Sequence, residues 1–332
     1  MSVAGKRILV TGADGFIGSH LVERLVADGA LVRALCYYTS NGTHGWLDGV
    51  AATPPGAMEL RLGDVRDAEL MADMCAGVDI VLHLAALIAI PYSYQAPRSY
   101  VDTNVVGTLN VLEAARRHGV ERFVHTSTSE VYGTPASVPI SEGHALHGQS
   151  PYSASKIGAD MLCEAWSRAF ELPVVVLRPF NTYGPRQSAR AIIPTILGQL
   201  LSGVRPLRLG SLEPRRDFTF VSDTVDGFVR AATTDLEAGQ VIQLGTGHSV
   251  SMSELVQRAV SATGVEDPVE VVLDDLRVRP ARSEVEVLQS DPSRAAQLLG
   301  WHPTVDLDRG LRIVAEWLRP RVDPAFAAQY RR

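Results

Sequence analysis

A glycine-rich turn near the start of the chain constrains the fold more than any other feature. Gly12, Gly15 and Gly18 are spaced three residues apart, directly after the apolar run 7–10 and at the start of a segment with helical periodicity. Gly12 permits a tight turn, Gly15 lets the backbone approach a phosphate, and Gly18 lets a helix pack closely on a strand. The chain is therefore expected to begin with a strand–turn–helix unit that binds the pyrophosphate of a dinucleotide, rather than with a simple turn.

Short apolar runs alternate with helical segments through the first half of the chain. This alternation is typical of a doubly wound, Rossmann-like α/β fold with a parallel sheet. The pattern predicts strands at 7–10, 31–37, 59–62, 80–84, 122–126 and 174–178, and helices at 16–28, 99–118 and 152–170. We therefore predict a dinucleotide-binding domain over residues 1–178.

The character of the sequence changes after Pro179. Prolines and arginines become more frequent, and the segments look shorter and less regular. We expect a smaller C-terminal α+β substrate lobe over residues 179–320, with segments of about 217–250 crossing back to the first domain and adding a strand near 241–244. Residues 321–332 are expected to form a tail.

Composition excludes several classes of function. The 332 residues suffice for about two domains, with an ordinary 46% of apolar and 20% of charged residues. A net charge of −6 argues against general nucleic-acid binding. Cys36, Cys75 and Cys163 lack metal-site spacing and cannot all pair, which favours a reducing cytoplasm and no bound metal. We expect no signal peptide and no membrane partner, since no apolar stretch is long enough to span a bilayer.

Tyr152 and Lys156 lie one helical turn apart in the predicted helix 152–170. A phenol has a pKa of about 10 and is a poor base at neutral pH. A nearby ammonium and a positively charged nicotinamide ring would lower that pKa. Two unrelated surface residues could show the same spacing, but the glycine turn in the same chain favours a redox enzyme that transfers a hydride to or from a nicotinamide.

A third cluster, Thr128, Ser129 and Glu130, follows the predicted strand 122–126. The carboxyl ends of strands in open α/β sheets face the ligand crevice. Thr128 can hydrogen-bond a sugar hydroxyl, and Glu130 can act as a base. The alternative for Glu130 is a solvated loop carboxylate.

The choice between NAD and NADP is less direct. An acid about 20 residues past the glycine turn usually holds the adenosine ribose, but residues 30–46 contain no Asp or Glu, and Cys36 and Tyr37 occupy its place. No Arg or Lys follows Cys36 closely enough to bind a 2′-phosphate. We therefore expect NAD. Asp64 is a candidate for the adenine amino group, or else a loop acid at a strand end.

Five motifs together resemble one family over nearly the whole chain, the extended short-chain dehydrogenase/reductases that epimerise or dehydrate nucleotide sugars. The motifs are Thr11–Gly18, His83–Ala86, Thr103–Thr108, Tyr152 with Lys156, and Arg178–Pro185. The resemblance implies tightly held NAD, a nucleotide-diphosphate sugar as substrate, and a homodimer that packs helices 99–118 and 152–170 across a two-fold axis.

The resemblance also implies roles for individual residues. The catalytic residues would be Thr128, Ser129, Glu130, Tyr152 and Lys156. Besides Tyr152 and Lys156, NAD would be bound by Gly12, Gly15, Phe16, Ile17, Gly18, Asp64, Val65, Leu84, Ala85, Ala86 and Asn104. The substrate would be bound by Asn181, Arg190, Arg216 and Arg279. An arginine fork suits a diphosphate, although Arg216 could equally be a surface residue.

The subfamily follows from finer similarities. Residues 185–195 are similar to amino-sugar 4,6-dehydratases of legionaminic-acid-type pathways, which act on an N-acetylglucosamine nucleotide. Many sugar 4,6-dehydratases carry an Asp-Glu pair where this chain has Ser129 and Glu130. A Ser-Glu pair also resembles the UDP-glucuronate decarboxylases. Simple 4-epimerases usually lack the Glu. We expect a 4,6-dehydratase acting on UDP- or GDP-N-acetylglucosamine. The alternatives are a UDP-glucuronate decarboxylase, a 4-epimerase, or a non-catalytic protein that keeps the cofactor fold.

Overall fold

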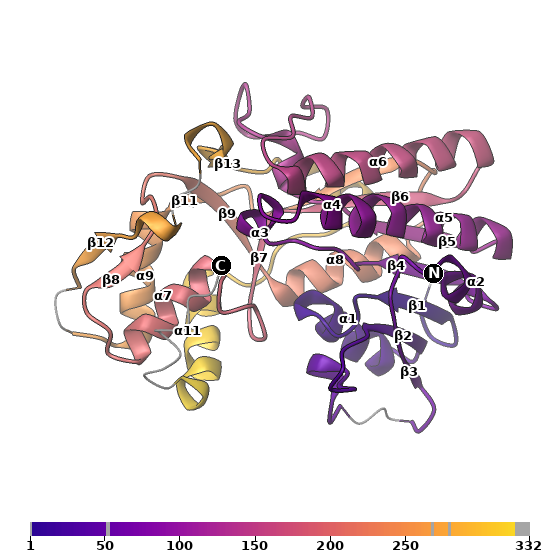
Figure 1. Ribbon diagram of the computed structural model, residues 1–332, viewed down its shortest axis with the longest axis horizontal. Coiled ribbons are helices and arrows are strands. Elements are labelled where there is room, and N and C mark those ends of the chain that lie inside the picture. Colours follow the sequence, from indigo (N-terminus) through magenta and orange to yellow (C-terminus); the bar gives the residue numbers. More distant parts are fainter. Residues whose placement is uncertain (1, 51–53, 267–268, 278–279, 323–332) are drawn as a thin grey trace.

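A parallel sheet lies at the centre of the computed structural model, which describes residues 2–50, 54–266, 269–277 and 280–322 (Figure 1). Over these residues the sheet has seven strands in the order β3-β2-β1-β4-β5-β6-β10. The strands are β1 (Arg7–Thr11), β2 (Leu31–Tyr37), β3 (Met58–Gly63), β4 (Ile80–His83), β5 (Arg122–Thr126), β6 (Val174–Pro179) and β10 (Gln240–Leu244). Every strand predicted from the apolar runs is present, and β10 pairs in parallel with β6 at the sheet edge.

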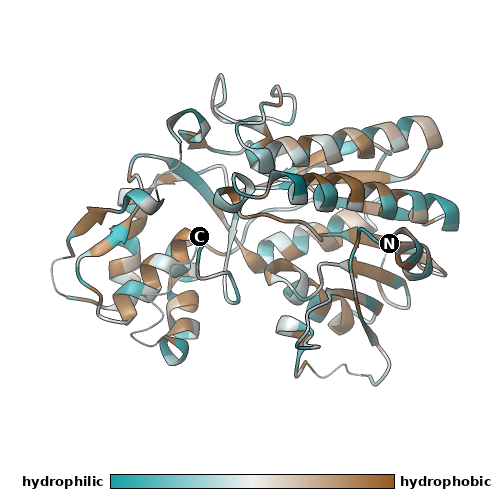
Figure 2. Ribbon diagram, viewed as in Figure 1, coloured by the Kyte–Doolittle hydropathy of each residue, from teal (hydrophilic) through white to brown (hydrophobic). Residues whose placement is uncertain are grey.

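Helices cover both faces of the sheet, which is why its central strands are apolar along their length. Two separate apolar cores result, one on each face. One face carries α1 (Phe16–Ala27) and α8 (Val221–Thr233); the other carries α2 (Ala68–Cys75), α5 (Gly107–His118) and α6 (Pro151–Phe170). Figure 2 shows the strands of this sheet as largely hydrophobic and the outer loops as more hydrophilic. The Rossmann-like α/β fold is confirmed.

The long helix predicted at 99–118 is built from three consecutive segments. It begins as α4 (Pro97–Tyr100), continues as a π-helical segment (Val101–Val106) and ends as α5 at Gly119, which adopts a left-handed conformation with φ of 63°. Short π-helical segments within α-helices occur frequently at functional sites. Helix α6 begins with a capping box between Ser150 and Ser153.

A smaller lobe, at the left of Figure 1, combines short strands and helices. Its strand β9 (Arg215–Phe220) pairs with β7 (Asn181–Tyr183), β11 (Ser249–Ser251) and β13 (Val287–Leu288), and β8 (Leu207–Leu209) pairs with β12 (Val271–Leu273). Its helices are α7 (Ile192–Leu201), α9 (Met252–Thr263) and α11 (Leu307–Leu318), whereas α10 (Ser293–Leu299) contacts β10 and α8 of the sheet domain. Helix α7 is buried along nearly its whole length and contacts α9 and α11.

Short helical turns complete the chain. These are α3 (Ile90–Ser93), the 3-10 turns Gly45–Leu47, Ser129–Tyr132, Asp275–Arg277 and Ala281–Ser283, and a last turn at Arg319–Arg321. The predicted tail 321–332 lies almost wholly outside the described residues. Within the part of the chain that the structure describes, no helix is long and apolar enough to cross a bilayer, and no group of three or more metal-ligating side chains is found.

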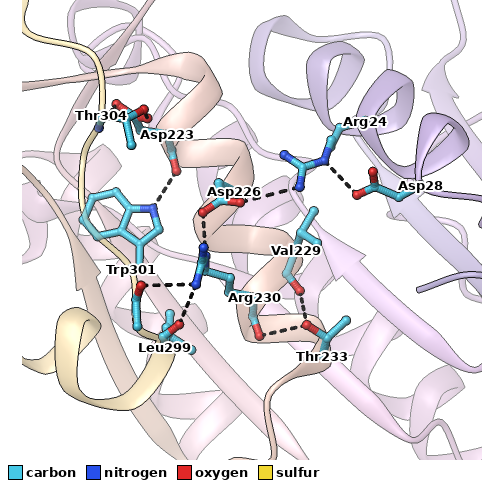
Figure 3. A network of polar contacts seen from close by, with 11 residues as sticks. Arg24, Asp28, Asp223, Asp226, Val229, Arg230, Thr233, Leu299, Trp301 and Thr304 are labelled. Atoms are coloured by element: carbon cyan, nitrogen blue, oxygen red, sulfur yellow. Dashed lines mark hydrogen bonds and ion pairs between the residues drawn. The ribbon is translucent and has the colours of Figure 1, made fainter. Parts of the chain in front are cut away.

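Helix α8 ties the last part of the chain to the sheet domain (Figure 3). The buried Asp223 carboxylate accepts hydrogen bonds from the Thr304 N–H (3.0 Å), the Thr304 hydroxyl (2.6 Å) and the Val305 N–H (3.0 Å). The indole of Trp301 donates to the carbonyl of Asp223 at 2.8 Å. Two turns on, Arg230 donates to the carbonyl of Leu299 at 3.1 Å. These contacts hold the segment between α10 and α11 against α8, which packs on the central sheet.

Candidate active site

The glycine turn between β1 and α1 has no room for side chains at two positions. Gly12 has a φ of 67°, which L side chains rarely adopt, and a Cβ there would lie 2.9 Å from the Cα of Ala85. A Cβ on Gly18 would collide with the carbonyl oxygen of Gly12. The two glycines are therefore required for the turn to contact both its own helix and the loop after β4.

The amino end of α1 is open to an anion. Gly15 occupies the N-cap, no side chain caps the helix, and the first turn, which includes Phe16 and Ile17, carries no acidic residue. The first N–H groups of a helix have no partner within it and attract negative charge. Together with the close approach at Gly12, this turn has the shape and polarity that a dinucleotide pyrophosphate requires.

A chain of buried hydrogen bonds holds the loop after β4. Thr11 Oγ1 accepts from the N–H groups of Leu84 and Ala85, each at 3.1 Å. Its own hydroxyl proton is then directed to His83 Nδ1 at 2.8 Å, so His83 carries its proton on Nε2 and donates to Thr108 at 3.0 Å. Burial lowers the pKa of His83 well below its usual value, which keeps the ring neutral. Ala86, the next residue of this loop, is half-buried.

Asn104, predicted as a cofactor contact, is buried and bonds to protein groups. Its side-chain oxygen accepts from the Leu87 N–H at 2.8 Å, and its amide nitrogen donates to the Leu87 carbonyl at 3.0 Å and to Ser155 Oγ at 2.9 Å. Asn104 lies in the π-helical segment. It joins the loop after β4 to α6, and so positions the tyrosine helix against the glycine turn.

The end of the sheet near β3 carries the candidate adenine contacts. Asp64 pairs with Arg66 at 2.6 Å. Partial burial alone would raise the pKa of Asp64, but the hydrogen bonds from Arg66 outweigh it and lower the pKa. Val65 is buried and lies against Gly107 of α5. Asp64 is thus a carboxylate at the carboxyl end of β3 whose oxygens are engaged by Arg66, and its contact with adenine stays a prediction.

Three of the predicted catalytic residues come together at the start of α6. Tyr152 is buried, with its ring packed edge-on against Tyr100 at 6.2 Å. Burial raises the pKa of Tyr152, a hydrogen bond with Thr128 lowers it, and the Glu130 carboxylate raises it again. Thr128 Oγ1 also accepts from the Glu130 N–H at 3.2 Å. In the protein alone burial dominates and the pKa of Tyr152 is raised; the lowering by Lys156 and a nicotinamide ring stays a prediction.

Lys156 follows Tyr152 by one turn and is buried. Its ammonium donates to the carbonyl of Thr126, the last residue of β5, at 2.6 Å. Burial lowers the pKa of Lys156, and the Asp160 carboxylate opposes this. Ser129, the remaining predicted catalytic residue, is also buried, in the turn that follows Thr128.

A buried ionic cluster below Lys156 escaped the sequence analysis. The Asp160 carboxylate accepts from Ser127 Oγ at 2.8 Å and from Arg178 Nη2 at 2.9 Å. Arg178 also donates to the Tyr132 hydroxyl at 3.0 Å. Burial alone would raise the pKa of Asp160, but His125 and Arg178 lower it, so the carboxylate stays charged. The sequence offered one sign of this cluster: Asp160 follows Lys156 by four residues and so lies on the same face of the helix.

The predicted substrate residues lie on the side of the smaller lobe. Asn181 begins β7, and its side-chain oxygen is buried without a hydrogen-bond partner among the described residues. Arg216 is 5% exposed and forms an ion pair with Glu284 at 2.9 Å. Arg190 is exposed and near enough to Tyr100 to act on its pKa, which burial raises to about 12. Arg279 lies outside the described residues.

Comparisons with known proteins agree with this geometry. The sequence matches the family model described as GDP-mannose 4,6 dehydratase over residues 9–314. It is 36% identical over 321 residues to a UDP-glucose 4-epimerase of Mycolicibacterium smegmatis, covering 94% of this chain and 98% of that one.

Two solved structures show the same likeness. DesIV, a dTDP-glucose 4,6-dehydratase from Streptomyces venezuelae with NAD bound, has a TM-score of 0.85 and 33% identity, covering 95% of this chain and 97% of that one. A UDP-N-acetylglucosamine 4-epimerase from Methanobrevibacter ruminantium has a TM-score of 0.86 and 26% identity, covering 96% and 100%. These matches confirm the resemblance inferred from the motifs. The chain therefore belongs to the GDP-mannose 4,6 dehydratase family, among the short-chain dehydrogenase/reductases that dehydrate or epimerise nucleotide sugars.

Proposed function

We propose that the protein is an NAD-dependent nucleotide-sugar 4,6-dehydratase that acts on UDP- or GDP-N-acetylglucosamine. The observation that carries this proposal is the position of Glu130, whose carboxylate lies close enough to Tyr152 to act on the pKa of the phenol. A carboxylate beside the oxidation centre is needed for dehydration and has no role in a simple 4-epimerisation. DesIV, a dehydratase that carries NAD, supports the reaction class and the cofactor.

The glycine turn, the loop Leu84–Ala86, Asp64 and Val65 would hold NAD. Bound NAD would supply the reversible hydride acceptor that the reaction needs for oxidation at C4 and reduction at C6. Because the same cofactor is regenerated in each cycle, it need not leave the protein.

The side chains move the protons. Tyr152 removes the proton of the sugar 4-hydroxyl, and Thr128 hydrogen-bonds the same oxygen. Lys156, held at the end of β5, is the cation that stabilises the Tyr152 phenolate. Glu130 then removes the C5 proton, which the 4-keto group has made acidic. Since Ser129 replaces the usual acid, Glu130 passes that proton to the C6 hydroxyl, which leaves as water. C5 takes up a proton from solvent when the hydride returns to C6, and Tyr152 releases to solvent the proton that it took from the 4-hydroxyl.

The smaller lobe would hold the nucleotide. Arg216 is the candidate residue for binding the diphosphate. The ion pair between Arg216 and Glu284 would then have to break or be shared with the diphosphate. The side-chain oxygen of Asn181, which is buried without a partner among the described residues, could accept a hydrogen bond from the substrate. Arg190 and Arg279 are further candidates for binding the substrate. An N-acetylglucosamine nucleotide is supported by the similarity of residues 185–195 to amino-sugar dehydratases and by a relative named for that sugar.

Two alternatives share the first oxidation. Ser129 favours a UDP-glucuronate decarboxylase, in which the 4-keto acid loses carbon dioxide. The 36% identity to a UDP-glucose 4-epimerase favours a 4-epimerase, in which the 4-keto sugar is reduced from its other face. A non-catalytic cofactor-binding protein is disfavoured, because Thr128 and Tyr152 remain in contact.

A homodimer is also part of this proposal. Val101, Val106 and Met161 are exposed apolar residues on the two long helices, which lie side by side (Figure 1). Apolar residues gathered on a helix pair suit burial against a second copy of the pair.

Mass spectrometry of products tests the reaction class. The protein is incubated with UDP- and GDP-N-acetylglucosamine, UDP-glucose and UDP-glucuronate. We expect loss of water from an N-acetylglucosamine nucleotide. Loss of carbon dioxide from the glucuronate without dehydration of any substrate would establish the decarboxylase instead, and a product of unchanged mass but altered C4 configuration would establish the epimerase.

A further inference from the structure

The end of β2 lacks the acid that dinucleotide-binding folds of this type place there for the adenosine ribose. Cys36 is fully buried in the sheet core, so its side chain cannot reach a ligand. The side chain of Tyr37 is 57% exposed and offers no carboxylate. A protein that binds NAD through this fold therefore needs its ribose carboxylate from another part of the chain.

Asp14, in the middle of the glycine turn, lies at this place. Its Oδ2 accepts a hydrogen bond from the backbone N–H of Tyr37 at 3.2 Å. This contact puts the carboxylate at the carboxyl end of β2, beside the residue that would otherwise carry the acid. The glycine turn also holds the pyrophosphate in the proposed function, so a single turn presents both the phosphate-binding amides and a carboxylate.

A second turn holds Asp14 in position. The carbonyl of Asp14 accepts from the Trp46 N–H at 3.3 Å. A Cβ on Gly45 would lie 2.8 Å from the same carbonyl oxygen, so the Gly45–Leu47 turn packs directly on Asp14. The carboxylate is thus preorganised by backbone contacts from two elements.

The charges around Asp14 are unsuited to an added phosphate. Burial raises the pKa of Asp14, and the hydrogen bond from the Tyr37 N–H and the nearby His44 oppose this rise. His44 is itself paired with Asp48 at 3.3 Å. Burial raises the pKa of the Cys36 thiol to about 12, and the carboxylates of Asp14 and Asp48 add to this rise. Two carboxylates therefore face the end of β2. A phosphate placed there would be repelled by both.

We propose that Asp14 holds the hydroxyls of the adenosine ribose and thereby selects NAD over NADP. This inference rests on the dinucleotide site of the proposed function. The two ribose hydroxyls donate to the Asp14 carboxylate, whereas a 2′-phosphate removes one donor and adds negative charge. Asp14 takes the place of the acid that is absent at residues 36 and 37.

Cofactor affinity measured by calorimetry tests the assignment without recourse to turnover. The full-length protein, freed of bound nucleotide, is titrated with NAD and with NADP, as are the variants Asp14→Asn and Asp14→Ala. Asn keeps an acceptor for the Tyr37 N–H, so this variant should fold normally. Asp235→Asn is the control, because Asp235 is exposed and acts on Arg122 at the opposite end of the sheet.

We expect the Asp14 variants to bind NAD about ten- to a hundredfold more weakly, in line with the loss of hydrogen bonds to a charged group, and to lose most of the preference for NAD over NADP. The control should match the wild type, and thermal unfolding should show that all variants fold. Unchanged NAD and NADP affinities in both Asp14 variants would overturn this inference alone. A wild-type protein that binds neither dinucleotide would overturn the proposed function, and the inference with it.

Discussion

The phenol of Tyr152 shows how a buried environment prepares a residue for chemistry. Burial and the nearby Glu130 carboxylate favour its neutral form, while the hydrogen bond with Thr128 favours the phenolate. Lys156 is buried close by, with its ammonium on the Thr126 carbonyl. The balance of these opposing effects decides when the phenol gives up its proton, and it depends on groups within one turn of α6 and the end of β5.

Tyr152 and Glu130 should fail at different steps when they are substituted. Tyr152→Phe removes the base for the 4-hydroxyl, so we expect a loss of at least 100-fold in every activity, in line with the usual worth of a positioned base. Glu130→Gln should still oxidise C4 but should neither lose water nor exchange the C5 hydrogen with deuterated solvent. Absorbance of the reduced cofactor in a single turnover separates the two, because only Glu130→Gln should reduce bound NAD. Normal dehydration by Glu130→Gln would exclude Glu130 as the C5 base.

His125 makes the stability of the protein depend on pH. Burial lowers its pKa from 6.5 to about 4, assisted by Lys156 and opposed by Asp160. Below pH 6.5 the unfolded chain binds a proton that the folded ring does not take up until about pH 4, so stability is lost as the pH falls through this window. The slope should be at most about 1.4 kcal/mol per pH unit for this one group.

Urea unfolding measured across this pH window checks the expectation. The variant His125→Gln keeps a polar side chain but does not titrate, so its stability should fall less steeply than that of the wild type. Groups remote from His125 contribute equally to both proteins and cancel in the difference. Parallel pH profiles for the two proteins would contradict a neutral, buried His125.

At the scale of elements, α8 joins the sheet to the smaller lobe. One face of α8 packs on the sheet, and polar groups of α8 form hydrogen bonds with the segment 299–305 (Figure 3). Asp223 satisfies two backbone N–H groups and one hydroxyl of that segment. Asp226, one turn on, pairs with Arg230 at the partly exposed surface. The two carboxylates should therefore differ greatly in their effect on stability.

Asp223→Ala should destabilise the protein by about 2–4 kcal/mol, because it leaves the N–H groups of Thr304 and Val305 without their acceptor. The matched variant Asp226→Ala breaks only partly exposed ion pairs and should cost less than about 1 kcal/mol. Urea unfolding followed by tryptophan fluorescence measures both, since Trp301 lies in the affected segment. Equal effects of the two substitutions would contradict the anchoring role of Asp223.

At the scale of the whole molecule, the parallel sheet brings loops from distant parts of the chain to one edge. Strands β1, β4 and β5 deliver the glycine turn, the loop at Leu84 and the Thr128 turn to the same edge, because parallel strands all end on one side. Helices α5 and α6 lie side by side on one face of the sheet (Figure 1), and both the π-helical segment before α5 and α6 itself leave apolar side chains exposed. The catalytic helix is therefore also the helix expected at the dimer interface.

Light scattering should give twice the mass of one chain at micromolar concentration. Val106→Glu and Met161→Glu place charges on the helix pair and should yield a monomer with an unchanged circular dichroism spectrum. Leu273→Glu is the control: Leu273 is 64% exposed in the smaller lobe, so this substitution should leave the dimer intact. A monomeric wild type would refute the dimer.

Much of the fold could be predicted because it depends on local patterns. The apolar runs, the glycine turn and the left-handed residue at Gly119 each act over a few neighbouring residues, and the predicted strands are found within a few residues of their bounds. Helix α2 was not predicted, because its eight residues carry only a short apolar pattern. The π-helical segment Val101–Val106 was predicted as ordinary helix, since no local pattern in the sequence distinguishes the two.

The sequence by itself determined the spacing of Tyr152 and Lys156, the shape of the glycine turn and the family, because each is a property of consecutive residues. Tertiary structure alone decided which groups meet across the sheet: Asp160 with Arg178, Asn104 with the loop after β4, and Asp14 with the end of β2. It also decided the direction of the Tyr152 pKa shift, since desolvation depends on everything that packs around the ring. The physical reason is the same in each case: these contacts join residues far apart in the chain, and their strength depends on burial, which no local pattern records.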